Sequence, residues 1–174
     1  PGGGASGGGG SAIVTPPIVP IIPETEIGAF TDLGGFDWAE ESIKALAEKK
    51  IINGVGDGKY EPKRSVKREE ILKMLLSAYD VKIETNPTDS FSDVSAAEWY
   101  SPYVTTAKSL GLVSGTGDGV FGVGSFVTRE DVAVMAYRIA THKGRNFDLS
   151  EEKFGDDESI SDYAKEAVYA LKQS

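Results

Sequence analysis

Apolar residues recur at helical spacing along several segments of the chain, beginning after residue 36. The first stripe consists of Ile43, Leu46, Ala47 and the stem of Lys50. Asp37 and Glu40 stand ahead of it at the spacing of a capping box, in which each side chain satisfies a backbone N–H of the first turn. This pattern predicts an amphipathic helix of about three turns.

Three further stripes have the same periodicity. One begins near Pro102, which is tolerated in a first helical turn, and two follow Arg68 and Arg129. Their members are Val104, Ala107 and Leu110; Ile71, Met74, Leu75 and Ala78; and Val132, Met135, Ala136 and Ile139. We interpret all four stripes as core-facing helix surfaces rather than cofactor-binding ones.

Glycine-rich segments separate the helices of each pair. Gly-Val-Gly-Asp-Gly occupies residues 54–58, and Gly-Thr-Gly-Asp-Gly occupies residues 115–119. Glycine reaches positive φ without the penalty that other residues meet, so each segment predicts a tight, irregular loop between two helices.

The whole arrangement repeats at a constant offset of 61 residues. Aromatic, glycine, arginine and methionine positions all recur: Phe30/Phe91, Asp32/Asp93, Trp38/Trp99, Gly54/Gly115, Arg68/Arg129 and Met74/Met135. A third copy begins at Phe154 and reaches only its first helix. We therefore divide the chain into a Gly/Pro-rich linker (1–29), repeat 1 (30–90), repeat 2 (91–153) and the first half of repeat 3 (154–174).

Each repeat has one apolar face that it cannot bury alone, so the repeats are expected to pack on one another. The predicted fold is an all-α bundle of helix–loop–helix repeats. Residues 1–29 are expected to form a tether with a flexible glycine part and a stiffer proline part, or to dock their Ile and Val side chains on the next domain. The chain starts with Pro1 and stops within repeat 3, so an export signal is expected to lie outside it.

Composition excludes several classes of function. The net charge of −9 argues against nucleic-acid binding, and no apolar run reaches the length of a membrane-spanning helix. With no Cys and one His, His142, the chain offers neither a nucleophilic triad nor a usual zinc site. The Gly-Asp-Gly loops lack the regular acidic spacing of calcium loops. We therefore expect neither an enzyme nor a cofactor or metal site.

The motifs, and the order in which they follow one another along the chain, resemble those of the S-layer homology domain. The chain has Phe-x-Asp, a Trp eight residues after the Phe, Gly-x-Gly-Asp-Gly, an aromatic residue and an Arg at a helix start. The family's Thr-Arg-Ala-Glu signature becomes Lys-Arg-Glu-Glu at 67–70 and Thr-Arg-Glu-Asp at 128–131.

The resemblance covers residues 30–174 and implies a pseudo-threefold bundle with grooves that bind secondary cell-wall polysaccharide, often carrying pyruvate ketals. It implies an exported bacterial protein held non-covalently at the cell wall or S-layer, with other surface proteins as further partners. The alternative function is a structural module that self-assembles into a surface lattice without binding sugar.

Arg68 and Arg129 are the first candidates for binding such a polymer. A ketal carboxylate fits a helix N-terminus, and a planar guanidinium adds two parallel hydrogen bonds. The alternative is that each Arg pairs with a nearby Glu or Asp and ties its helix to a loop.

Aromatic and turn residues form a second group of candidates. Trp38 and Trp99 either stack on sugar rings or anchor the core. A second set either contacts sugar or serves only the turns: Gly56, Asp57, Gly117 and Asp118.

Two departures from the family signature concern the helix starts. Lys67 replaces the capping Thr that repeat 2 keeps as Thr128, so the first helix start is expected to lack a side-chain cap unless Ser65 substitutes. Glu69 and Glu130 replace a small residue, and their charge is expected to oppose an anionic ligand. Lys67 and Thr128 complete the set of candidate polysaccharide-binding residues.

Overall fold

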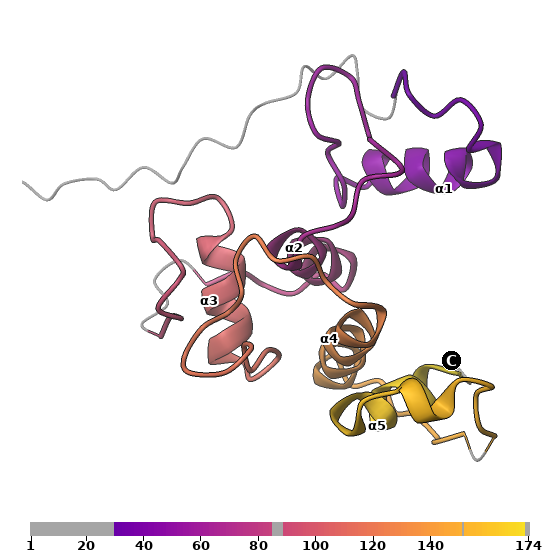
Figure 1. Ribbon diagram of the computed structural model, residues 1–174. Coiled ribbons are helices and arrows are strands. Elements are labelled where there is room, and N and C mark those ends of the chain that lie inside the picture. Colours follow the sequence, from indigo (N-terminus) through magenta and orange to yellow (C-terminus); the bar gives the residue numbers. More distant parts are fainter. Residues whose placement is uncertain (1–29, 85–88, 151, 173–174) are drawn as a thin grey trace, which may run out of the picture.

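The computed structural model describes residues 30–84, 89–150 and 152–172, and these fold into helices joined by loops (Figure 1). The elements are α1 (Asp37–Glu48), α2 (Arg68–Ala78), α3 (Ser101–Ser109), α4 (Arg129–His142), the short 3-10 helix η2 (Asp157–Ser159) and α5 (Asp162–Lys172). Extended pairing in these ranges is limited to three isolated bridges. The all-α prediction is confirmed, whereas the predicted linker, 1–29, lies outside the described residues.

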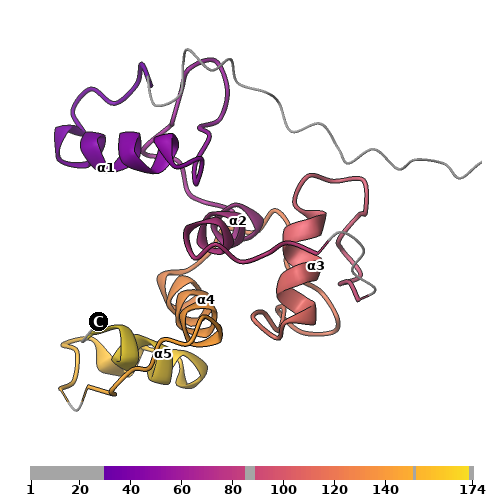
Figure 2. The ribbon, with the colours of Figure 1, turned by 180° about the vertical axis from the view of Figure 1, so that it is seen from behind.

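The second helix of one repeat packs on the first helix of the next. The helix pairs in contact are α2 with α3, α4 with α5, and α2 with α4. Both views place α2 and α4 centrally, with α3 and α5 on either side (Figures 1 and 2). The expectation that the repeats bury their apolar faces against each other is therefore confirmed.

The largest core cluster joins repeats 1 and 2. Its fully buried side chains come from four different segments: Leu72, Leu76, Val104, Phe121 and Ile139. Burial of each stabilises the fold by about 1.5–3 kcal/mol relative to exposure. A smaller cluster holds α1 through Ile43 and Ala47, and a third joins α4 to α5 through Val134 and Ala164.

The start and end of α1 differ from the prediction. Phe36 occupies the N-cap position without a side-chain bond, and Asp37 is already the first helical residue, so no capping box forms. Glu40 instead pairs with Lys44 one turn later, at 2.6 Å. Lys50 lies beyond the helix with φ +57°, where it ends the helix rather than extending the apolar stripe.

The two central helices begin differently, as their sequences predict. Thr128 caps α4, its Oγ accepting a hydrogen bond from the Asp131 N–H at 3.2 Å. Lys67 occupies the N-cap position of α2, but its side chain forms no capping hydrogen bond, and Ser65 does not substitute for the missing hydroxyl. The Glu70 carboxylate satisfies the Lys67 N–H at 2.9 Å, which is half of a capping box.

Each glycine-rich segment forms a tight turn. Asp57 and Gly58 have φ of +48° and +66°, and Lys59 N–H donates to the Gly56 carbonyl at 2.9 Å. Two successive positive φ values closed by this bond define a type I′ turn, for which Asp-Gly is a preferred pair. Asp118 and Gly119 repeat it, with φ of +49° and +73°.

Candidate functional site

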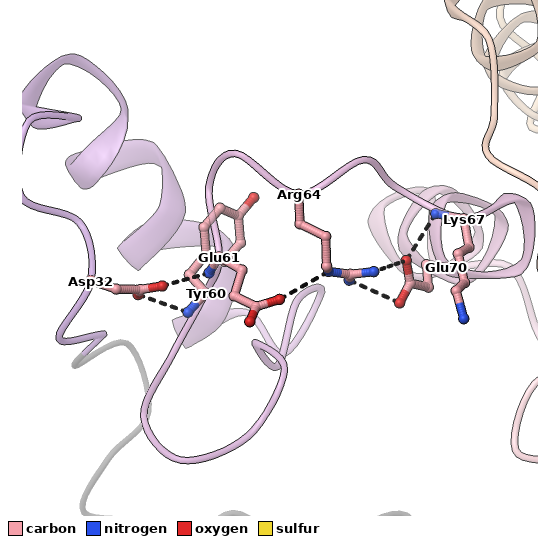
Figure 3. A network of polar contacts seen from close by, with 6 residues as sticks. All are labelled: Asp32, Tyr60, Glu61, Arg64, Lys67 and Glu70. Carbon is pink, nitrogen blue, oxygen red and sulfur yellow. Dashed lines mark hydrogen bonds and ion pairs between the residues drawn. The ribbon is translucent and has the colours of Figure 1, made fainter.

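The aspartate of each Phe-x-Asp motif fixes the loop that leads to the second helix. Asp93 accepts hydrogen bonds from three successive backbone N–H groups, those of Phe121, Gly122 and Val123, at 2.8–2.9 Å. Asp32 accepts from two, those of Tyr60 and Glu61, at 2.9 and 2.7 Å (Figure 3). The sequence signal for this role was the recurrence of both aspartates at the repeat offset.

These bonds favour the ionised carboxylates. The Tyr60 N–H makes the largest contribution to lowering the pKa of Asp32. For Asp93, partial burial alone would raise the pKa, but the backbone donors of Phe121, Val123 and Gly122 outweigh it and the net shift is downward. Both loops are thus held by charge-assisted bonds at neutral pH.

A second carboxylate ties the end of the repeat 1 loop to α2. Glu70 accepts two hydrogen bonds from the Arg64 guanidinium, at 2.9 and 3.1 Å, besides the one from the Lys67 N–H (Figure 3). The Glu70 carboxylate also makes the main contribution to raising the pKa of Arg64. This two-bond pair between Arg64 and Glu70 fixes the segment that leads into α2.

Repeats 1 and 2 meet directly at their helix starts. Arg68 N–H donates to the Ser125 carbonyl at 2.9 Å, and Val127 N–H donates to the Val66 carbonyl at 3.1 Å. Between these two bonds, Lys67 and Phe126 lie opposite each other in an antiparallel bridge. The candidate residues Lys67 and Arg68 therefore sit at a junction between repeats.

Arg68 is buried at this junction. Its residue exposure is 7%, its guanidinium carbon lies 5.3 Å from the centre of the Phe121 ring, and Nη1 lies 3.1 Å from the Asp131 carboxylate. Its Nε is buried without a hydrogen-bond partner in the part of the chain that the structure describes. For Arg68 the geometry favours the ion-pair alternative, and the pair spans two repeats.

Arg129 stands at the equivalent place in repeat 2 but is exposed. Across residues 30–84, 89–150 and 152–172, its guanidinium forms no hydrogen bond or ion pair. It occupies the first position of a 14-residue helix whose N-cap is Thr128. Such a helix start carries unpaired N–H groups and a partial positive charge, so Arg129 is free to meet an anion there.

Glu69 and Glu130 each form hydrogen bonds to the following repeat. Glu69 is 4% exposed and accepts a hydrogen bond from the Gly124 N–H of repeat 2 at 2.9 Å. Glu130 accepts from Ser161 of repeat 3, at 3.0 Å from its N–H and 3.1 Å from its hydroxyl. Because each carboxylate is bonded to the following repeat, both serve to join repeats, a role that the sequence analysis did not predict.

The tryptophans lie at the surface. Trp38 is 85% exposed at the start of α1, and Trp99 is 39% exposed with its ring edge-on to Tyr100 at 5.5 Å. The interpretation of Trp38 as a core anchor is therefore wrong. Among the described helices, α1, which carries Trp38, does not contact α4, which begins at Arg129, and the two helices lie apart in both ribbon views (Figures 1 and 2).

The candidate turn residues are exposed at the loop tips: Gly56, Asp57, Gly117 and Asp118. Their backbone angles satisfy the type I′ turns, which favours the turn role over sugar contact. The structure thus gathers Lys67, Arg68 and Thr128 near the two central helix starts and leaves the turns elsewhere in their loops.

No helix among the described segments combines the length and apolar character needed to cross a bilayer.

Comparison with known proteins identifies relatives of several kinds. The chain is 35% identical over 136 residues to an amylopullulanase of Thermoanaerobacterium thermosulfurigenes and to the exoglucanase XynX of Acetivibrio thermocellus, which covers 76% of the chain but 7% and 12% of those proteins. It is 30% identical over 115 residues to an S-layer protein of Bacillus thuringiensis subsp. finitimus, covering 65% of the chain and 14% of that protein. The chain thus corresponds to a small part of these curated relatives.

A family model identifies the part that the chain shares with these relatives. The S-layer homology domain matches residues 29–72 and 90–133, which span most of repeats 1 and 2 as the sequence divides them. This domain is a non-catalytic module associated with anchoring at the cell surface, and it is common to relatives named as enzymes and as S-layer proteins. With its repeated motifs, all-α fold and matched segments, the chain belongs to the S-layer homology domain family.

Proposed function

We propose that this chain holds an exported bacterial protein non-covalently at the cell surface by binding secondary cell-wall polysaccharide, and that its ligand group is a carboxylate such as a pyruvate ketal. The observation that supports the proposal is that the Arg129 guanidinium is exposed and has no partner among the described residues. An unpaired, exposed guanidinium at the start of a long, side-chain-capped helix is well placed for a carboxylate.

The other candidate residues take different parts in this proposal. Arg68 acts mainly by fixing repeat 1 against repeat 2, because its guanidinium already pairs with Asp131. The exposed rings of Trp38 and Trp99 offer flat apolar surfaces to sugar rings. Asp57 and Asp118 contribute through the turns that they form rather than through contact with sugar. In this proposal the protein lies outside the cell, at the wall or in the S-layer.

The test is co-sedimentation of the purified chain with wall sacculi, before and after chemical removal of the polysaccharide. The chain is expected to pellet with intact sacculi and to stay in solution with stripped ones, and Arg129→Ala is expected to weaken pelleting about tenfold. Arg145→Ala is the matched control, because Arg145 is also exposed but lies beyond the end of α4.

Equal pelleting with intact and stripped sacculi would reject the polysaccharide as the ligand. Concentration-dependent assembly of the chain without any wall material would then favour the lattice module instead. Equal loss of binding in Arg129→Ala and Arg145→Ala would reject the assignment of the site to the start of α4.

A further inference from the structure

A lysine and a phenylalanine from different repeats lie side by side at the junction of repeats 1 and 2. The bonds from Arg68 N–H to Ser125 and from Val127 N–H to Val66 bracket the bridge between Lys67 and Phe126. In an antiparallel pair, residues bracketed in this way form the non-hydrogen-bonded type, in which the two side chains are closest and project from the same face. The two side chains therefore share one surface.

Both side chains are available on that surface. Phe126 is 67% exposed, which is unusual for a phenylalanine and leaves most of its ring uncovered. The Lys67 ammonium extends away from the Glu70 carboxylate (Figure 3). No hydrogen bond or ion pair from this ammonium reaches any residue of the described ranges.

The carboxylates nearest in sequence are already engaged. Glu70 is held by the Arg64 fork and by the Lys67 N–H, and Asp131 is paired with Arg68. Glu69 is buried on the Gly124 N–H. The charged side chains left without a partner here are therefore the cations Lys67 and Arg129, of which Lys67 is the one that lies opposite Phe126 in the bridge.

An uncovered ring beside an unpaired cation suits one class of ligand. The face of an aromatic ring packs against the apolar C–H face of a pyranose, while an ammonium attracts a carboxylate on the same sugar. A neutral sugar would use only the ring, and a small inorganic anion only the ammonium. The pair of groups matches an acidic sugar.

We propose that Lys67 and Phe126 together form a subsite for an acidic sugar residue of the wall polysaccharide, with the ring of Phe126 under the sugar and the Lys67 ammonium on its carboxylate. This inference rests on the proposed function. It adds a contact residue, Phe126, that neither the repeat motifs nor the helix starts indicate.

The subsite belongs to this junction alone among the described repeat positions. One repeat earlier, the position of Phe126 is held by Ser65; one repeat later, the position of Lys67 is held by Thr128. Neither Ser65 nor Thr128 offers a ring or a cation. The pair therefore distinguishes this junction from the other junctions between repeats.

The experiment measures binding of the full chain to purified wall polysaccharide by titration calorimetry. Phe126→Ala and Lys67→Gln are each expected to weaken binding about tenfold, and Phe126→Tyr and Lys67→Arg are expected to restore it. The controls are Leu149→Ala and Lys82→Gln, which remove an exposed apolar side chain and an exposed lysine elsewhere. Thermal unfolding checks that every variant folds.

A polysaccharide whose carboxyl groups have been chemically reduced separates the two contacts. On this polymer the Lys67→Gln effect is expected to disappear while the Phe126→Ala effect persists. If the unaltered chain binds the polymer, and Phe126→Ala and Lys67→Gln each bind it as tightly as the unaltered chain does, the subsite is refuted and the proposed function stands. If the unaltered chain does not bind the polymer at all, both fail.

Discussion

The Arg68 guanidinium lies 3.1 Å from the Asp131 carboxylate, so the first residue of α2 is paired with an acid in the first turn of α4. The side chain of Arg68 is 9% exposed and that of Asp131 26%. Asp131 also accepts a hydrogen bond from the Tyr163 hydroxyl of repeat 3 at 3.2 Å. One carboxylate thus contacts both of the other repeats.

Removing the arginine of this pair is expected to destabilise the fold. Arg68→Ala leaves the Asp131 carboxylate without its main partner, and the free energy of unfolding is expected to fall by about 3 kcal/mol. Arg129→Ala is the matched control, expected to change it by less than about 0.5 kcal/mol because Arg129 is exposed and unpaired. Urea unfolding measures both. Equal destabilisation by the two substitutions would contradict the asymmetry of the two helix starts.

The Glu130 carboxylate is expected to control how firmly repeat 3 is attached. Glu130→Ala removes the acceptor of the Ser161 N–H and hydroxyl, so residues 154–172 are expected to open more often than the rest of the chain. Amide hydrogen exchange should show faster exchange within α5 and little change within α2. Faster exchange in α2 and α5 alike would indicate a global loss of stability instead.

Acid is expected to release the loops held by Asp32 and Asp93. In the folded chain the pKa of each carboxyl lies below the usual value for aspartate, because backbone N–H groups stabilise the ionised form. Because the unfolded chain binds more protons in that range, the stability from these bonds is fully present above about pH 4 and is lost as pH falls through the folded-state values. Asp93→Asn is expected to flatten the rise of stability between about pH 2 and pH 4, as followed by thermal unfolding. An unchanged acid limb in Asp93→Asn would assign the acid sensitivity to other groups.

The sequence predicted the features that depend on local pattern. Helical periodicity predicted the positions of the helices, the glycine-rich segments predicted tight loops between them, and the missing hydroxyl at Lys67 predicted the difference between the two caps. Contacts between repeats could not be predicted in this way. Glu69 reaches Gly124, 55 residues further on, and periodicity carries no information on which distant backbone N–H a carboxylate will meet.

The candidate site residues also differ in ways that the sequence pattern cannot predict. Arg68 and Arg129 are equivalent in the repeat, so the sequence treats them alike, yet one is buried on Asp131 and the other is exposed. Burial depends on which loop covers the helix start, which is a tertiary property. Phe126 was missed because it belongs to no recurring motif; the usable signal was a large aromatic residue at a position held by Ser65 in repeat 1.

The first glycine of each turn segment is expected to be intolerant of any side chain. Gly115 has φ +74°, and a Cβ there would collide with the Val120 carbonyl oxygen and the Phe91 ring. Gly115→Ala is expected to cost about 4 kcal/mol of unfolding free energy, from backbone strain and overpacking together. Gly34→Ala is the control, since a Cβ at Gly34 meets nothing within 4 Å. A tolerated Gly115→Ala would show that the loop is softer than its geometry implies.

The chain's two tryptophans allow the exposed aromatic surface of α1 to be examined separately from that of repeat 2. In Trp99→Phe the remaining fluorophore is Trp38, which is 85% exposed, so its emission is expected to be red-shifted and readily quenched by iodide. In Trp38→Phe the remaining Trp99, 39% exposed and packed on Tyr100, is expected to be quenched less.

Adding wall polysaccharide should protect whichever ring stacks on sugar. If Trp38 contributes to binding, the Trp99→Phe variant will show a blue shift and reduced quenching at saturating polymer, because a sugar face excludes water and iodide from the indole. Trp38→Ala is then expected to weaken binding without lowering the unfolding free energy, since so exposed a side chain contributes little to the core. Unchanged emission in Trp99→Phe, together with normal binding by Trp38→Ala, would remove α1 from the binding surface and confine it to the starts of α2 and α4.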